Sequence, residues 1–263
     1  MDSFETLQTQ SLETDILQVR LNRPEAANAL NTRMGRDLLA LFMGLNADPR
    51  QARCIILSGT GERAFCAGGD LKERNGMTDA QWQDQHLIFE QMIRAIIDCP
   101  IPIVAAVNGA AYGGGLEIAL GCDFIYAART ARFALTEVTL GIMPGCGGTQ
   151  NLPRAVGERR AKELIMSGNV FSADEALQWG LVNRVCEPDK LVGDALEIAR
   201  KIAGNGPIAV RQAKHAIHHG LDLSLANGML LEIQAYNRLP PTQDRREGIL
   251  AFNEKRRPVF KGD

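Results

Sequence analysis

The chain has 263 residues, of which 45% are hydrophobic and 23% charged, and its formal net charge is −2. This composition is typical of a globular protein that buries one sizeable core, and the lack of excess Lys and Arg does not favour binding to nucleic acid or to an anionic membrane. The sequence has no recognisable signal peptide or apolar span of roughly 20 residues, and its six dispersed cysteines include no CxxC pair. We therefore expect a cytoplasmic protein with reduced thiols and no membrane partner.

The first half of the chain alternates between predicted strands and helices. Residues 16–22 alternate apolar and polar side chains as a half-exposed strand does, whereas 54–59 and 103–107 are continuous apolar runs typical of buried strands. Residues 79–98 carry apolar side chains at helical spacing, and Pro100 follows them. Further short strands are predicted at 124–128, 132–135 and 181–185. This order predicts an α/β core with a weak strand-strand-helix repeat.

The second half of the chain is predicted to be mostly helical from about residue 158, after an ordered loop at 141–150. Ser172 and Glu175 form a capping box before one helix. Later helices are predicted at 189–204, 207–219, 224–237 and 242–255. Their apolar stripes need a cover, and a helical tail of this kind often packs against a neighbouring subunit. We therefore divide the chain into a core domain, 1–195, and a helical oligomerisation region, 196–263.

Two segments share one pattern, in which a buried strand leads into a glycine-rich loop and then a helix start. The first loop ends with Gly68 and Gly69, and the second contains Gly113, Gly114 and Gly115. Glycine lets the backbone approach a ligand closely, and the N-terminus of a helix carries unpaired N–H groups. Two such donors that converge would form an oxyanion hole. A tight turn is the simpler interpretation of either loop alone, and the matching contexts leave both interpretations open. Signatures of phosphate-binding loops and serine hydrolases are absent.

Two glutamates flank this glycine-rich backbone. Glu117 lies in the first turn of its predicted helix, where it could simply complement the helix dipole, a contribution of about 0.3–1 kcal/mol. Glu137 follows a short strand and could equally be a solvated loop charge. Two nearby carboxylates can also divide general-base and general-acid work. His215, His218 and His219 occur at helical spacing without a carboxylate at metal-site spacing, so we predict no metal site.

Three long segments resemble the crotonase, or enoyl-CoA hydratase/isomerase, superfamily. They are AFCAGGDLKE (64–73), IPIVAAVNGAAYGGGLEIALGCD (101–123) and TEVTLGIMPGCGGTQNLPRAVG (136–157). The similarity extends over essentially the whole chain, through residues 244–256. It implies an α/β spiral of repeated ββα units followed by a C-terminal helical trimerisation region, with trimers that commonly pair into hexamers.

The resemblance also implies a site. It assigns the oxyanion hole to the N–H groups of Gly69 and Gly114. It places coenzyme A, which is part of the substrate and not a separate cofactor, against Arg63, Ala67, Gly68, Gly69, Asp70, Leu71, Lys72, Phe252 and Lys255. Of these, Phe252 and Lys255 resemble residues that the adjacent subunit lends to the pocket.

Both carboxylate positions of the hydratases are filled, by Glu117 and Glu137, whereas isomerase members usually keep only the position of Glu137. The resemblance therefore implies an enoyl-CoA hydratase that converts a 2-enoyl-CoA to a 3-hydroxyacyl-CoA. Glu117 would activate water, with the N–H of Gly145 helping to hold it, and Glu137 would protonate the α-carbon.

Two alternatives stay open. Residues 72–77 and 239–262 look most like the methylglutaconyl-CoA hydratase branch of leucine degradation. Animal members of that branch include RNA binders whose binding is associated with a lysine-rich helix. The matching stretch, 79–98, has Arg94 as its only Lys or Arg, so RNA binding is disfavoured.

Overall fold

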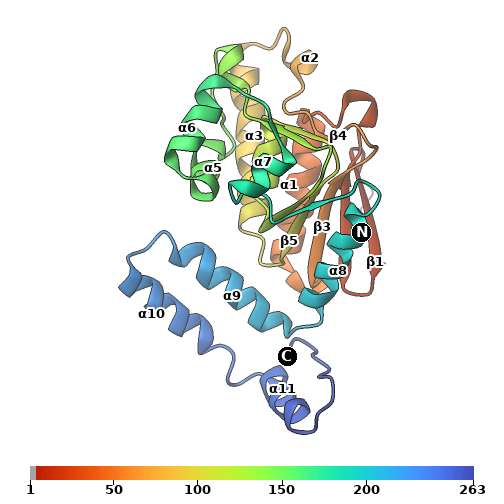
Figure 1. Cartoon of the computed structure of the whole chain (residues 1–263), viewed down its shortest axis with the longest axis vertical. Helices are drawn as coiled ribbons and strands as arrows, with labels where there is room; N and C mark the ends of the chain where they lie inside the picture. The colour runs from red at the N-terminus through yellow and green to blue at the C-terminus, as the bar shows by residue number, and fades with distance from the viewer. Residues whose placement is uncertain (1–3) are drawn as a thin grey trace.

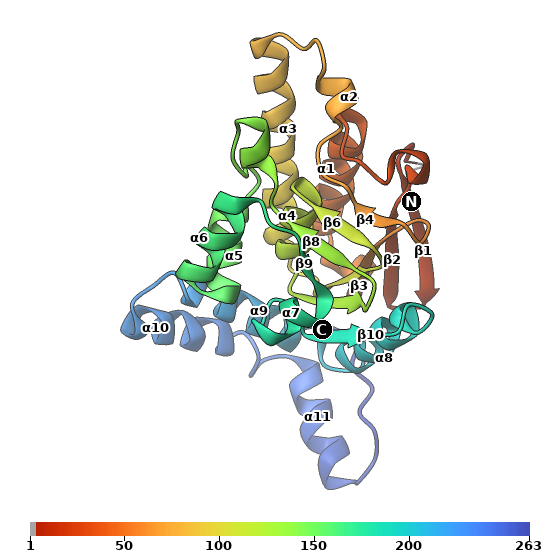
Figure 2. The same ribbon diagram turned by 45° about the horizontal axis from the view of Figure 1, so that its top comes forward.

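The computed structural model describes residues 4–263, which fold around two sheets. The six-stranded sheet has the order β1 (Leu7–Glu13), β2 (Ile16–Leu21), β3 (Cys54–Gly59), β5 (Ile103–Val107), β7 (Phe124–Ala128), β10 (Arg184–Cys186). The four-stranded sheet has the order β4 (Ala64–Cys66), β6 (Ala110–Tyr112), β8 (Arg132–Ala134), β9 (Phe171–Ser172). Figure 2 shows the two sheets side by side.

Helices follow the strand pairs. In chain order they are η1 (Pro24–Ala26), α1 (Thr32–Ala47), η2 (Pro49–Gln51), α2 (Leu71–Arg74), α3 (Asp79–Ile97), α4 (Gly114–Leu120), η3 (Glu137–Leu140), α5 (Gly148–Val156), α6 (Glu158–Ser167), α7 (Ala173–Gln178), α8 (Leu191–Ala203), α9 (Pro207–Gly220), α10 (Leu225–Tyr236) and α11 (Gln243–Asn253). Capping boxes at Thr78 with Gln81 and at Ser172 with Glu175 begin α3 and α7.

The expected repeat of two strands and a helix is confirmed. Each of the pairs β3–β4, β5–β6 and β7–β8 places one strand in each sheet. Within the six-stranded sheet β3, β5 and β7 are parallel, and within the other sheet β4, β6 and β8 are parallel. The loops after β4 and β6 therefore leave neighbouring strands at the same edge, and this brings the two glycine-rich loops together.

The prediction for residues 16–22 is wrong in one respect. β2 is an inner strand and is almost entirely buried, with Val19 and Leu21 at 0% exposure. The polar segment before it forms β1, an antiparallel edge strand that the sequence analysis did not anticipate. β2 pairs with β1 and β3, and its side chains enter both core clusters, Val19 the larger and Ile16 the smaller, so both of its faces are covered, which the alternation of its side chains did not indicate.

Other boundaries shift by a few residues. The last strand of the core is β10, at Arg184–Cys186 instead of 181–185, and the helical half begins at Gly148, within the predicted loop and before residue 158. The helix α1, which packs beside α3, was also not anticipated.

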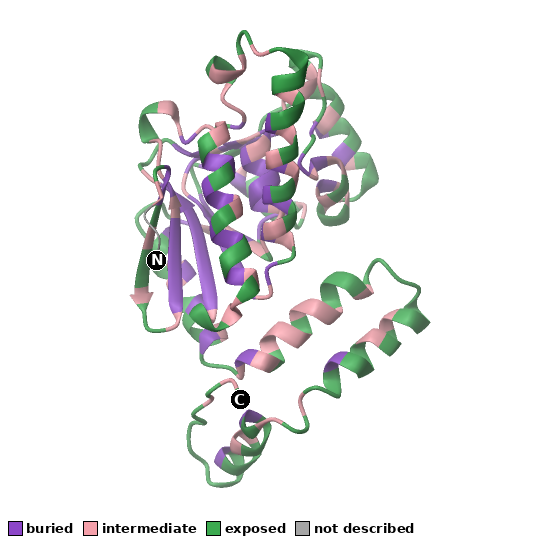
Figure 3. Cartoon of the chain, turned by 180° about the vertical axis from the view of Figure 1, so that it is seen from behind, coloured by how far each residue is buried: buried purple, intermediate pink, exposed green. Residues whose placement is uncertain are grey.

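The core has two parts. The larger cluster lies under α1 and α3, and the smaller lies where α8 covers the other face of the sheet, with Ala195 and Ala199 against Ile56 and Val104. The predicted boundary at residue 195 therefore falls inside α8. Figure 3 shows the central strands buried, whereas α9, α10 and α11 are mostly exposed or half-buried.

The three C-terminal helices project from the core (Figure 1). They carry large apolar side chains that are more than half exposed, including Ile217 (65%), Leu225 (82%) and Phe252 (83%). In the described part of the chain all six cysteines are free, and no helix is long and apolar enough to cross a bilayer.

Candidate active site

The residues predicted to form the oxyanion hole and to move protons meet in one cavity of about 720 Å³. Its wall contains both predicted oxyanion glycines, Gly69 and Gly114, both glutamates, Glu117 and Glu137, and also Gly145. Residues of α3 and of the loop that precedes α5 form other parts of the wall. Residues far apart in the sequence are thus brought to one place.

The two glycine loops touch each other. A Cβ at Gly68 would stand 2.9 Å from the carbonyl oxygen of Tyr112 and 3.6 Å from the Cα of Gly113. Both Gly68, at φ +93°, and Gly113, at φ +51°, adopt a backbone conformation that side chains disfavour. Only glycine at these two positions allows the loops to approach so closely.

Each loop presents a backbone donor to the cavity. The N–H of Leu30 donates to the carbonyl of Gly68 (2.8 Å) and the N–H of Asp70 donates to the carbonyl of Leu30 (2.9 Å), so the N–H of Gly69 points away from this pairing. Gly114 is the first residue of α4, where an N–H has no partner within the helix. Among residues 4–263 neither N–H donates to a protein acceptor.

Glu117 is held by main-chain groups. Its side chain is buried, and Oε1 accepts hydrogen bonds from the N–H groups of Cys146 (2.7 Å) and Gly148 (2.8 Å). Burial raises its pKa to about 7, although these two hydrogen bonds lower it, and the charge of Glu137 adds a smaller increase. A carboxyl group with this pKa can take up and release a proton near neutral pH.

Glu137 begins η3 and lies against the second glycine loop. A Cβ at Gly113 would stand 3.0 Å from its Oε1, so glycine makes room for the carboxylate. Its Oε2 is buried and has no hydrogen-bond partner in residues 4–263. Burial raises the pKa of Glu137. The two carboxylates therefore share a cavity and differ in their hydrogen bonds.

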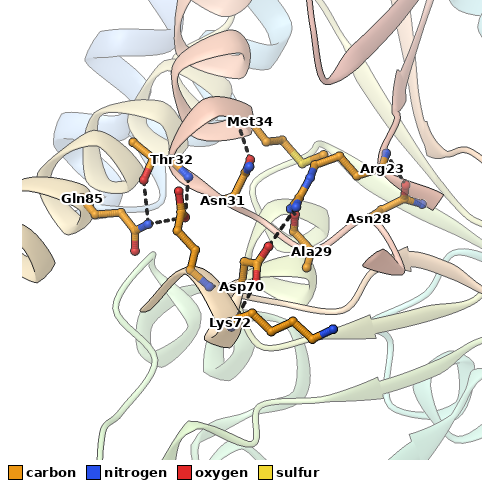
Figure 4. Close-up of polar contacts among 10 residues, drawn as sticks. Arg23, Asn28, Ala29, Asn31, Thr32, Met34, Asp70, Lys72 and Gln85 are labelled. Atoms are coloured by element: carbon orange, nitrogen blue, oxygen red, sulfur yellow. Dashed lines mark hydrogen bonds and ion pairs between the residues drawn. The ribbon is translucent and has the colours of Figure 1, made fainter. Parts of the chain in front are cut away.

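Asp70 fixes the first glycine loop through its side chain (Figure 4). Oδ2 pairs with Nη2 of Arg23 (2.9 Å), and Oδ1 accepts from the N–H of Lys72 (3.1 Å) and so caps α2. The same guanidinium donates to the carbonyl of Ala29 (2.6 Å). This network ties the loop to the segment before α1.

The residues expected to bind coenzyme A do not all lie at the cavity of one chain. Those in its wall are Ala67, Gly68, Gly69 and Leu71. Lys72 is exposed beside it, and Asp70 turns toward Arg23. Arg63 is exposed in the turn before β4, and Phe252 and Lys255 lie on and after α11; none of the three is in the wall.

Sequence reasoning missed several residues of the site. Cys146 and Gly148 hold Glu117, and Arg74, Trp82 and His86 line the cavity. The run of glycines at 145–148 was the available signal for the first pair. Within the described residues, no group of three or more His, Cys, Asp or Glu side chains could hold a metal ion.

Residues 11–263 match the enoyl-CoA hydratase/isomerase family. The chain belongs to this family. It is similar to a crystal structure of an enoyl-CoA hydratase from Bacillus anthracis, at 44% identity and a TM-score of 0.96, over 98% of this chain and 100% of that one. The fold is that of crotonase.

Two curated relatives differ in their substrates. The chain is 40% identical to a short-chain-enoyl-CoA hydratase of Clostridium acetobutylicum, over 93% of this chain and 94% of the relative. It is 39% identical to a mitochondrial methylglutaconyl-CoA hydratase of Homo sapiens, over 100% of this chain and 79% of the relative.

Proposed function

We propose that this protein adds water across the 2,3 double bond of a 2-enoyl-CoA thioester and releases a 3-hydroxyacyl-CoA. The observation that carries the proposal is the placement of Glu117 and Glu137 in one cavity with the uncommitted N–H groups of Gly69 and Gly114. The family and the names of its hydratase relatives support the same reaction.

The thioester carbonyl oxygen binds between the N–H groups of Gly69 and Gly114. When the oxygen of water attacks the β-carbon, negative charge moves through the α-carbon onto that carbonyl oxygen, where the two donors stabilise it. A single donor of this kind is worth on the order of 10²–10³ in rate.

The two glutamates move the protons. Glu117 accepts a proton from the attacking water, and Glu137 delivers a proton to the α-carbon, so that H and OH are added in total. General acid–base catalysis of this kind contributes roughly 10²–10⁴ in rate. Gly145, which lies in the cavity wall next to Cys146, supplies an N–H that helps to hold the water. No metal or separate cofactor takes part in this scheme.

Coenzyme A extends from the thioester along residues 67–72, with Arg63 near its phosphates. Phe252 and Lys255 lie outside the cavity of their own chain, which supports a role at the site of a neighbouring subunit.

The exposed apolar side chains of α9, α10 and α11 support a homotrimer or a pair of trimers. Light scattering tests this assembly, because its mass is a multiple of 28.7 kDa. Free cysteines, five of the six buried, support a cytoplasmic location.

The decisive experiment uses the variants Glu117→Gln and Glu137→Gln with crotonyl-CoA. Each variant loses at least about 10²-fold in kcat, while the Kd for the saturated thioester butyryl-CoA changes little. Glu163→Gln is the matched control, because that side chain lies on α6, 60% exposed and outside the cavity wall. Near-normal turnover of either active-site variant would contradict the proposal.

A further inference from the structure

Arg74 is a cationic side chain in the wall of the cavity. It is the last residue of α2 and is half-buried. Its Nη1 lies 3.4 Å from the position that a Cβ on Gly69 would occupy, so the guanidinium stands beside one of the two oxyanion donors. None of the proposed steps of hydration involves this charge.

The guanidinium is fixed by its neighbours. Its Nε donates to Oε1 of Gln85 (2.8 Å), and its Cζ lies 4.2 Å from the centroid of the Trp82 ring and 5.6 Å from that of Phe89. An Arg that stacks on an aromatic face keeps its plane in a defined orientation.

Gln85 is itself held by hydrogen bonds, which determine the atom that it offers to Arg74. The Gln85 Nε2 donates to Oγ1 of Thr32 (2.8 Å; Figure 4) and to Oε2 of Glu73 (2.7 Å), so its oxygen is left to accept from Arg74. Oε2 of Glu73 also accepts from the N–H of Thr32 (2.9 Å). This network occupies Nε and leaves Nη1 and Nη2 without an acceptor in residues 4–263.

Arg74 forms no direct ion pair in the described part of the chain. The Glu73 carboxylate is near enough to act on its charge but is bonded to Gln85 and to the N–H of Thr32, and Oε1 of Glu90 lies 3.4 Å from Nε2 of His86. A partly desolvated guanidinium is stable when its fork of donors meets an anion. A carboxylate fits the two free nitrogens in a bidentate arrangement.

We propose that Arg74 binds a carboxylate at the end of the acyl group, so that the preferred substrates are short 2-enoyl-CoA thioesters with a terminal carboxylate. This inference rests on the proposed hydratase function, whose substrate class it names. Since Arg74 stands beside Gly69, the carboxylate is only a few C–C bonds of about 1.5 Å from the thioester carbonyl.

The test compares two substrates of similar length, glutaconyl-CoA, which ends in a carboxylate, and 2-hexenoyl-CoA, which ends in a methyl group. The measured quantity is the ratio of their kcat/KM values in the wild type, Arg74→Met and Arg74→Lys. Arg74→Met lowers the ratio by about 10–100-fold, as expected for a lost charge-assisted hydrogen-bond pair. Arg74→Lys lowers it less, because Lys keeps the charge but not the fork. Arg94→Met, at an exposed position on α3 outside the cavity wall, leaves the ratio unchanged.

A second measurement does not depend on turnover. The Kd values of the saturated analogues glutaryl-CoA and hexanoyl-CoA, measured by calorimetry, show the same loss of preference in Arg74→Met. An unchanged ratio in Arg74→Met, or an equal loss for both acyl groups, would overturn the role of Arg74 and leave the hydratase function standing. Absence of hydration of either substrate by the wild type would overturn the proposed function, and the Kd comparison would still decide whether Arg74 binds a carboxylate.

Discussion

Gly148 donates its N–H to Oε1 of Glu117 over 2.8 Å, and a Cβ on Gly148 would stand 3.0 Å from that same oxygen. The N-terminus of α5 therefore holds the glutamate by its backbone, together with Cys146 of the preceding loop, and approaches it too closely for a side chain. Because the hydrogen bonds come from main-chain groups, the position of this carboxylate is set by the conformation of the loop. Burial within that loop is also what raises its pKa to about 7.

The pH dependence of hydration should report this pKa. Glu117 acts as a base only when ionised, so kcat/KM rises with pH and its rising limb has a midpoint near the pKa of about 7. Initial rates with crotonyl-CoA between about pH 5.5 and 8.5 measure it. A kcat/KM that does not change with pH over that range would mean that Glu117 is not the base.

The same pKa affects folding stability. Glu117 has a pKa raised from 4.5 to about 7 in the folded protein, so the folded state binds the proton more tightly than the unfolded state. The wild-type free energy of unfolding therefore falls by about 3 kcal/mol from this group as pH rises from about 4.5 to 7. The Glu117→Gln variant keeps an acceptor oxygen but does not titrate, so its stability lacks this dependence on pH.

We therefore expect the stability of Glu117→Gln relative to the wild type to increase between about pH 5 and 8. Urea denaturation at both pH values measures it, and Glu163→Gln at an exposed position is the control. A difference in unfolding free energy that stays constant with pH would mean that the pKa of Glu117 is not raised by folding.

Proton exchange at the α-carbon separates the roles of the two glutamates. Glu137→Gln should lose stereospecific exchange of an α-proton of a saturated acyl-CoA with deuterated solvent, by at least about 10²-fold. Proton NMR of the bound thioester measures the rate. Undiminished exchange in this variant would transfer the role of acid to another residue.

Gly115, at the end of the second glycine loop, packs too closely against Cys66 to be replaced by alanine without cost. A Cβ there would lie only 2.1 Å from the carbonyl oxygen of Cys66, which is backbone and cannot rotate away. Gly115→Ala should cost about 1–3 kcal/mol of stability and displace the N–H of Gly114, so that kcat falls.

Gly193→Ala is the matched control for this change. Gly193 lies in α8 with nothing within 4 Å of an added Cβ, so alanine there should stabilise the protein by about 0.5–1 kcal/mol. Thermal denaturation compares the two variants. A Gly115→Ala protein as stable and active as the wild type would mean that the two loops need not touch.

Much of the site could be predicted from local sequence. The two strand, glycine-loop and helix segments pointed to the glycine runs at 68–69 and 113–115 and, beside them, to Glu117 and Glu137, and the family resemblance then assigned the donors to Gly69 and Gly114. The four late helices were also predicted, because apolar periodicity and capping residues act over short distances, whereas the ββα repeat was weak in the residues themselves and was implied by the family resemblance. Contacts between distant segments were missed. β1 was overlooked because an edge strand can be polar, and β2 was thought half-exposed because its cover comes from elsewhere in the chain.

The sequence by itself determined which residues can supply donors and acids, since glycine-rich turns, helix starts and glutamates are local chemical facts. Only the tertiary structure decided which of those groups contact one another, and therefore their hydrogen bonds, burial and pKa values. In the folded chain Glu117 accepts hydrogen bonds from the N–H groups of Cys146 and Gly148. In the same cavity two nitrogens of Arg74 have no hydrogen-bond acceptor among the described residues. The physical reason is that burial and hydrogen bonding, which set a pKa or leave a charge without a direct ion pair, depend on segments that meet only after the chain has folded.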